Sequence, residues 1–232
     1  MNKPNQLIIL GGGSSIQEGI SLGLWDKIKD KFSIGTNYSY KFFSSTLQTF
    51  VDSTFFNNQR EELEKLPLII GQNRNIKNIP ANMLPIPSNS VYNRNLKGGI
   101  CSAKLCGIYS LSLAIYLLDE GEIFLLGYDS GAINKNLDDK KRKITHWYQN
   151  KIEHRGIGKT NYYDVKDRGD KDYGVYKQEK RVHIFNVSLQ SKINIFPKIS
   201  YEEFFKKLDN EIFNQEELRN YIKQKLVIRG SV

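Results

Sequence analysis

The chain has 232 residues, 39% of them hydrophobic and 12% aromatic, which is typical of a folded globular protein and excludes a disordered one. No apolar run approaches the roughly 18 residues that a membrane-spanning helix needs, and the N-terminus lacks a signal-peptide pattern. The cysteines Cys101 and Cys106 form no zinc motif and are expected to be reduced, which favours a cytoplasmic location. The formal net charge of +9 suits nucleic acid, anionic lipid or anionic small substrates, and equally suits a merely lysine-rich composition.

The first predicted strand, 7–10, runs directly into a glycine-rich turn, Gly11-Gly12-Gly13-Ser14-Ser15, and a helical pattern follows at 16–29. Glycine lets a backbone approach a ligand closely, and a helix N-terminus offers N–H groups to a phosphate. The same glycines also suit a plain tight turn. The turn matches neither the dinucleotide fingerprint nor the Walker loop, because the third glycine and the Gly-Lys-Ser/Thr ending are both missing.

Strands and helices alternate along the rest of the chain. Strands are expected at 32–36, 47–52, 67–71, 122–126, 181–187 and 193–196, and helices at 16–29, 59–65, 102–118, from 200 and at 216–224. Ser102 is expected to cap the central helix, and Ser200 with Glu203 forms a capping box. Residues 72–97 are rich in proline and asparagine and predict a long loop with room for one hairpin.

This alternation predicts an α/β fold in which residues 1–232 form a single Rossmann-like domain. The sheet should be mostly parallel, with helices on both faces. Residues 131–178 are polar and lysine-rich but contain several aromatic residues, so they are expected to form a lid or insertion over one edge of the sheet.

Ligands of parallel sheets bind at the carboxyl ends of the strands. Glycines and polar residues follow several predicted strands there, and they are expected to form a nucleotide site: Gly11, Gly12, Gly13, Ser14, Ser15, Asn37, Asp52, Gly127, Tyr128 and Asp129. Singly, each has a plain structural alternative. Asn37 fits a turn, and Asp52 and Asp129 fit turn caps.

Four segments carry motifs near these strand ends: 7–16, 34–37, 100–102 and 122–130. Together they resemble the bacterial sialyltransferases that have a single Rossmann-like domain, and the related pterin pyrophosphokinase-like proteins. In that family the first strand leads into Gly-Asn-Gly-Pro-Ser-Leu. Here Gly12 stands in the asparagine position and Ser14 in the proline position, which puts the asparagine's contact in doubt.

The resemblance covers residues 5–130, with a weaker likeness at 192–205. Ile34-Gly-Thr-Asn37 is similar to the second motif, whose asparagine contacts the nucleotide, and Asp52 lies where the family has Asn or Asp. Ser102 matches the serine of Thr-Ser-Gly at the start of the central helix, with Ala103 replacing the glycine, and the resemblance implies that Ser102 belongs to the nucleotide site. The segment 122–130 resembles Glu-Ile-Tyr-Leu-x-Gly-x-Asp-Phe and is the most specific match.

The resemblance implies a nucleotide-sugar-dependent glycosyltransferase, in which an acceptor hydroxyl attacks the anomeric carbon while a base removes its proton. No metal is required in the sialyltransferases. Histidine suits the base, and His146 and His154 in the predicted lid are the candidates; His183 lies in a strand pattern and is expected to be structural. Arg155, Tyr148 and Tyr162 are expected to contact the leaving phosphate.

Two other functions stay open at this point. A pterin-type pyrophosphokinase would need Mg²⁺, held by carboxylates such as Asp52 and Asp129. A catalytically silent nucleotide-binding protein would fit the two altered positions of the first motif. The acceptor is undetermined, and the charge of +9 permits nucleic acid.

Overall fold

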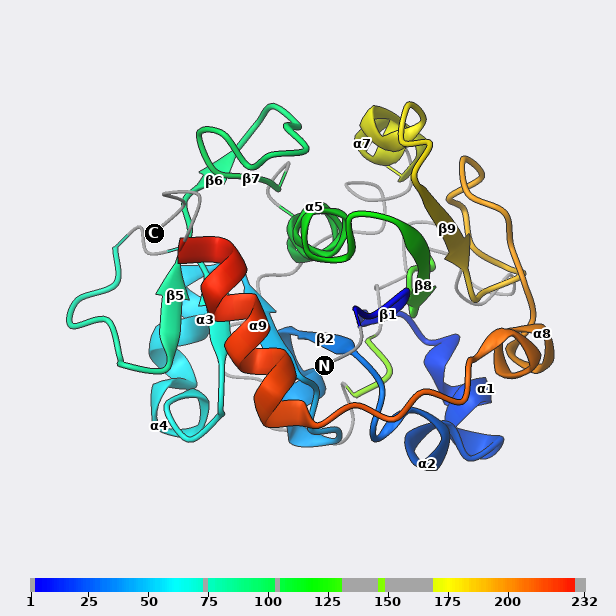
Figure 1. Ribbon diagram of the computed structural model, residues 1–232, viewed down its shortest axis with the longest axis horizontal. Coiled ribbons are helices and arrows are strands. Elements are labelled where there is room, and N and C mark those ends of the chain that lie inside the picture. The colour runs from blue at the N-terminus through cyan, green and yellow to red at the C-terminus, as the bar shows by residue number, and fades with distance from the viewer. Residues whose placement is uncertain (1–2, 73–74, 103–104, 131–145, 149–168, 228–232) are drawn as a thin grey trace, which may run out of the picture.

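The computed structural model describes residues 3–72, 75–102, 105–130, 146–148 and 169–227. Its centre is a seven-stranded sheet in the order β5-β4-β3-β2-β1-β8-β9, and every neighbouring pair is parallel (Figure 1). The strands are β1 (Gln6–Leu10), β2 (Ser33–Thr36), β3 (Leu47–Phe50), β4 (Ile69–Gly71), β5 (Met83–Pro85), β8 (Gly121–Leu126) and β9 (Val182–Asn186). The predicted α/β fold with a parallel, Rossmann-like sheet is confirmed.

The central strands are buried on both faces, which explains why they are continuously apolar. Side chains alternate across a strand, so Leu7 and Ile9 of β1 join the core around α5 (Cys106–Leu118), whereas Ile8 and Leu10 join the core on the opposite face. Helix α5 is buried along its length from Ile108 to Leu118, as expected of a helix covered on all sides.

The opposite face carries five helices of the described chain (Figure 1): α1 (Ile16–Ser21), α2 (Leu24–Ile28), α3 (Ser53–Asn58), α4 (Arg60–Leu63) and α8 (Tyr201–Lys207). The single helix predicted at 16–29 is wrong, because the chain breaks at Gly23, which adopts a left-handed φ of +77°. The capping box of α8 is confirmed: the Ser200 hydroxyl accepts the Glu203 N–H, and the Glu203 carboxylate accepts the Ser200 N–H.

The predicted start of the central helix at Ser102 is wrong. Helix α5 begins at Cys106 after Leu105, which provides no side-chain cap. Ser102 instead continues the short pairing of β6 (Ser88–Asn89) with β7 (Ile100–Cys101), where its N–H donates to the Asn89 carbonyl at 3.0 Å. That hydrogen bond makes Ser102 a continuation of the strand pairing, and the helix starts only at Cys106.

Two further expectations are corrected. Within 72–97 the described residues form β5, which pairs in parallel with β4, and β6, which pairs in parallel with β7, so no hairpin is found among them. No strand forms at 193–196; the isolated bridge to Asn186 comes two residues later, at Lys198.

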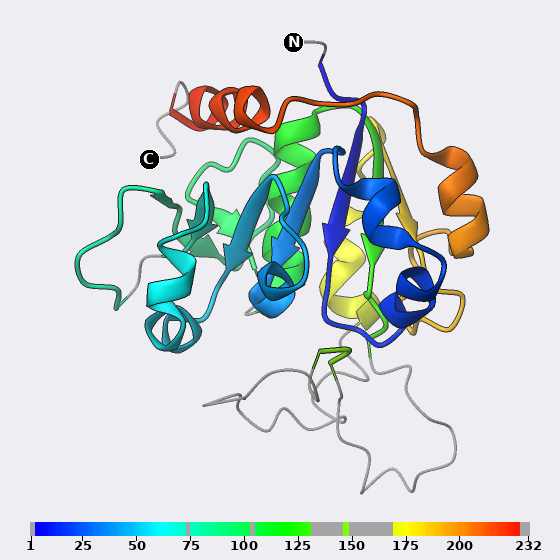
Figure 2. The same cartoon turned by 90° about the horizontal axis from the view of Figure 1, so that it is seen from below.

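The end of the segment predicted as a lid is part of the core. Residues 169–176 form α7 (Gly169–Tyr173) and η3 (Gly174–Tyr176) beside α5, and the Tyr176 hydroxyl donates to the Ile108 carbonyl at 3.1 Å. Residues 131–145 and 149–168 of the predicted lid lie outside the described residues. The chain ends its described part in α9 (Gln215–Val227), which crosses the amino edge of the sheet (Figure 2).

Candidate functional site

The order of the strands singles out one position on the sheet. The chain builds outward from β1 to β5, then crosses back through α5 to add β8 on the other side of β1. The connections that follow β1 and β8 therefore lead to described helices on opposite faces of the sheet, α1 and α7. The point between two such strands is where open α/β sheets bind ligands. Figure 2 shows the strands pointing to one edge, with residues 146–148 just beyond the ends of β1 and β8.

The glycine-rich turn after β1 packs tightly against the loop after β8. The Gly11 N–H donates to the Leu126 carbonyl at 2.7 Å, and the Gly13 N–H donates to the Gly127 carbonyl at 2.8 Å. A Cβ added to Gly11 or Gly13 would approach the Gly127 carbonyl to 2.7 or 2.6 Å. Close packing within the chain therefore accounts for these two glycines.

Asp129 anchors the same turn. Its side chain is 3% exposed, and its carboxylate accepts the Ser15 N–H at 2.8 Å and the Ser15 hydroxyl at 2.5 Å, with the Ser14 hydroxyl at 3.5 Å. The carboxylate thus lies at the start of α1, where the helix dipole favours a negative charge. The position at which a phosphate was expected is taken by the protein's own anion.

Residues 146–148 cover the remaining part of the turn. The Trp147 backbone N–H donates to the Gly12 carbonyl at 3.0 Å, and its indole N–H donates to the Gly11 carbonyl at 3.2 Å. The His146 ring stacks on Tyr148 with centroids 5.1 Å apart, and its Nδ1 lies 3.3 Å from the Gly12 carbonyl oxygen. A Cβ on Gly12 would come within 2.6 Å of this Nδ1, so His146 fills the space beside Gly12.

The Gly12 contact favours one tautomer of His146. A carbonyl oxygen only accepts hydrogen bonds, so a hydrogen bond between Nδ1 and this oxygen requires the proton on Nδ1. In a neutral ring the basic nitrogen is then Nε2, which is what a general base needs. Burial raises the pKa of the neighbouring Tyr148 well above its ordinary value, so this phenol stays protonated and can donate a hydrogen bond.

Asn37 lies one strand away, at the end of β2. Its backbone has φ +48°, which asparagine tolerates better than most residues, and its carbonyl accepts the Gln48 amide at 2.7 Å. Gln48 is 3% exposed in the middle of β3 and was missed by the sequence analysis. A lone amide in a buried strand is the signal that could have found it.

Asp52 and Ser102 have structural roles. Asp52 is exposed, and its carboxylate caps α3 by accepting the Thr54 N–H at 2.8 Å. It follows β3, three strand intervals from the end of β8, which is about 14 Å at about 4.8 Å per interval. The structure therefore gathers the glycine turn, Gly127–Asp129 and His146–Tyr148, whereas Asp52 caps a helix farther along the edge. His154, Arg155 and Tyr162 lie outside the described residues.

Cys106 is a further group near this edge. It is the first residue of α5, and its sulfur lies 3.7 Å from the Thr49 hydroxyl. Burial raises the pKa of the thiol to about 11, so the thiolate that a nucleophile requires is disfavoured. We therefore interpret Cys106 as a packing residue that contacts Asn37 and Thr49.

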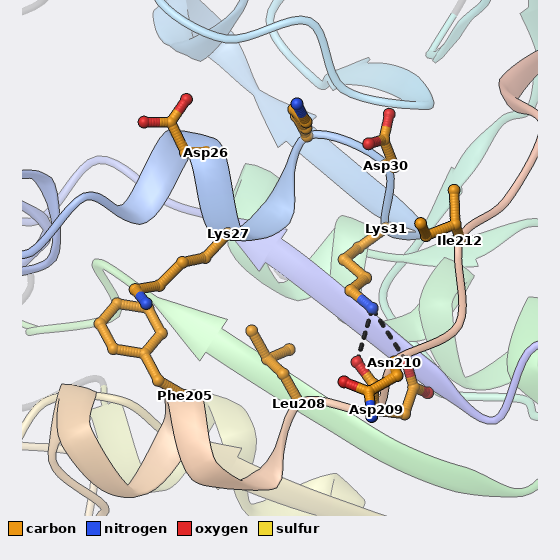
Figure 3. A pocket seen from close by; sticks show the side chains of 10 residues that line it. Asp26, Lys27, Asp30, Lys31, Phe205, Leu208, Asp209, Asn210 and Ile212 are labelled. Carbon is orange, nitrogen blue, oxygen red and sulfur yellow. Dashed lines mark hydrogen bonds and ion pairs between the residues drawn. The ribbon is translucent and has the colours of Figure 1, made fainter.

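A cavity of about 360 Å³ lies at the opposite, amino edge, between α2 and the connection from α8 to α9 (Figure 3). Charged residues of both signs line it, and the Lys27 ammonium lies over the Phe205 ring at 4.9 Å. It shares no residue with the predicted nucleotide site.

The described part of the chain contains no group of three or more His, Cys, Asp or Glu residues suited to a metal ion, and no helix able to cross a membrane. No family model matches the chain, and comparison with curated proteins and with solved structures found no similar protein.

Proposed function

We propose that this protein is a glycosyltransferase that takes a sugar from a nucleotide-activated donor bound at the ends of β1 and β8. The observation that carries the proposal is His146, whose ring lies on the glycine turn of the topological switch point with its Nδ1 3.3 Å from the Gly12 carbonyl oxygen, a contact that favours Nε2 as the basic nitrogen. A base at the ligand-binding edge of a parallel sheet is what transfer to a hydroxyl requires.

The resemblance to the sialyltransferase-like family supports the proposal, and the structure offers a physical reason for its main departure. Gly12 stands where the family has asparagine, and the His146 ring occupies the space that any side chain at position 12 would need. A polar group is thus still present beside the turn, but it comes from residue 146.

In the proposed reaction, the acceptor hydroxyl oxygen bonds to the anomeric carbon as the bond to the nucleotide phosphate breaks. The electron pair of that bond leaves with the phosphate, and His146 Nε2 takes the hydroxyl proton. The protonated Tyr148 phenol is a donor for the leaving oxygens, and Arg155 and Tyr162 remain predicted phosphate contacts. The cytoplasmic location and the acceptor also remain predictions from composition.

The pyrophosphokinase alternative is less well supported. It needs two carboxylates close enough to share Mg²⁺, but Asp52 and Asp129 follow strands about 14 Å apart. Both are already engaged, Asp52 in capping α3 and Asp129 in holding Ser15.

A thermal-shift screen of cytidine, uridine and adenine nucleotides and their sugar conjugates, with and without Mg²⁺, tests the proposal first. We expect a pyrimidine nucleotide to raise Tm without Mg²⁺. Transfer or hydrolysis of the donor that binds is then compared between His146→Gln and His183→Gln. His183 is the matched control, because it is exposed on β9 and pairs with Glu122 toward the amino edge.

We expect His146→Gln to lower kcat by at least about 100-fold with a nearly unchanged donor KM, and His183→Gln to leave both unchanged. A shift only by ATP with Mg²⁺ would indicate the pyrophosphokinase. Binding without turnover would indicate a silent nucleotide-binding protein, and no shift by any nucleotide would refute the site itself.

A further inference from the structure

Trp147 is an anchor inside the protein, although residues on both sides of 146–148 are strongly polar in sequence. Its side chain is 3% exposed and belongs to the core that contains Ile8, Leu10 and Phe124. The indole centroid lies 4.7 Å from that of Phe42 and 5.9 Å from that of Trp25. Burying a tryptophan in this way fixes the three-residue segment to the body of the protein.

The indole also sets the register of the segment on the glycine turn. Its Nε1–H donates to the Gly11 carbonyl while its backbone N–H donates to the next carbonyl, that of Gly12. One residue therefore donates hydrogen bonds to two successive carbonyls. This leaves the His146 ring at the Gly12 carbonyl and stacked on Tyr148, whose ring is tilted 69° against Trp147.

We infer that Trp147 is a positioning residue that holds His146 on the Gly12 carbonyl in the Nδ1-protonated form. Without the indole bond to Gly11, the segment keeps one fewer tie to the turn, and the imidazole relaxes toward the Nε2-protonated form. The catalytic consequence of holding His146 in this form rests on the proposed function. In that reaction the Nε2 lone pair takes the proton of the sugar-accepting hydroxyl.

Trp147→Phe is the central variant, because it keeps an aromatic ring in the core and removes the indole N–H together with part of the ring volume. Gly12→Ala is an independent second variant, since its Cβ would come within 2.6 Å of the His146 Nδ1 and would displace this ring. Trp25→Phe is the control: it changes the same aromatic cluster, and no hydrogen bond from the Trp25 indole occurs among the described residues.

The first readout is the tautomer of His146 by ¹⁵N NMR of the imidazole nitrogens, which the chain's three histidines make simple to assign. We expect Nδ1–H in the unaltered protein and in Trp25→Phe, and a rise of Nε2–H in Trp147→Phe and Gly12→Ala. The second readout is the pH profile of donor turnover, in which we expect Trp147→Phe to lose about tenfold in kcat with little change in donor KM.

Each outcome decides a separate point. An unchanged His146 tautomer in Trp147→Phe, whatever Gly12→Ala does, or Nε2–H in the unaltered protein, would overturn the inference. The expected tautomer shift with no turnover of any nucleotide sugar would keep Trp147 as the residue that positions His146 and would overturn the glycosyltransferase.

Discussion

Asp129 shows how one buried carboxylate can define a loop. Its two oxygens satisfy the Ser15 N–H and hydroxyl, and they lie at the start of α1, where negative charge is favoured. A residue used only to bind a nucleotide would have no reason to be 3% exposed and fully engaged within the chain. We therefore interpret Asp129 as the structural anchor of the glycine turn.

Asp129→Asn tests that role. The amide keeps one acceptor oxygen but directs an NH₂ group at a donor, so one buried hydrogen bond is lost and one donor is left unsatisfied. We expect the free energy of unfolding to fall by about 1–3 kcal/mol in urea, with an unchanged dependence on urea concentration.

Ser15→Ala is the matched control for Asp129→Asn. It removes only the hydroxyl bond and keeps the backbone bond, so a smaller loss of about 1 kcal/mol is expected. If Asp129→Asn were as stable as the unaltered protein while losing nucleotide affinity, Asp129 would be a ligand residue as the sequence predicted.

Residue roles at this site were only partly predictable. Three successive glycines indicate that another group packs closely against this backbone. The sequence does not show which group it is, because Gly127, Asp129 and His146 all lie more than 110 positions away. Such contacts depend on the tertiary fold and leave no local pattern. Gln48 did leave a local signal, a lone amide within a buried strand, but its partner Asn37, just past the end of β2, could be found only from the tertiary fold.

At the scale of elements, apolar strands and the capping box were predictable because their signals are local. Leu7–Leu10 and Ser200–Glu203 are examples. The predicted helix boundaries failed for two reasons. A hydrogen bond to the Asn89 carbonyl keeps Ser102 in the strand pairing, which is a tertiary contact. The left-handed conformation of Gly23 separates α1 from α2 although the apolar pattern continues through both.

Lys31 makes several of the contacts that hold the connection between α8 and α9. Its ammonium donates to the Asp209 carbonyl at 2.6 Å and forms an ion pair with the Asp209 carboxylate at 3.2 Å (Figure 3). It also donates to the Glu211 carbonyl at 2.6 Å. Its side chain is only 13% exposed. This arrangement ties the segment that leads to α9 to the loop before β2.

Lys31→Met should therefore loosen a whole element. It keeps the apolar stem but removes the lysine donor from two carbonyls and breaks the ion pair with the Asp209 carboxylate, so we expect a loss of about 2–3 kcal/mol in unfolding free energy. Amide exchange should become faster over 208–227. Lys29→Met is the control, because Lys29 is exposed on the same turn, and its change should stay within about 0.5 kcal/mol. Equal effects of the two variants would contradict the role of Lys31.

At the scale of the whole molecule, the alternation of elements was sufficient to predict the parallel sheet, because crossover helices impose it. It could not predict that β8 would pair with β1 and create the switch point there. Charge is also uneven along the chain: residues 131–168 contain ten lysines and arginines but five aspartates and glutamates. Residues 131–168 therefore carry a larger share of the net charge of +9 than their length alone would give.

The core is rich in buried tyrosines, and this determines how the molecule responds to alkali. Burial raises the pKa of Tyr109, Tyr128, Tyr176 and Tyr201 well above the ordinary value of 10.0. Because each pKa is higher in the folded state, the unfolded chain loses these protons first. The stability they contribute is present in full below about pH 10 and is lost as the pH rises further.

We therefore expect a steep alkaline unfolding, with up to about 5 kcal/mol lost per pH unit once all four phenols ionise only in the unfolded chain. Phenolate absorbance and loss of circular dichroism, followed in one pH titration, should then change together, because these protons leave only when the core opens. Tyr128→Phe removes one of the four phenols. Starting from its own unfolding free energy at neutral pH, this variant should therefore lose stability less steeply with pH and unfold at a higher pH than four phenols would allow. Ionisation of all thirteen tyrosines near pH 10 with the dichroism intact would contradict a core that keeps these phenols from water.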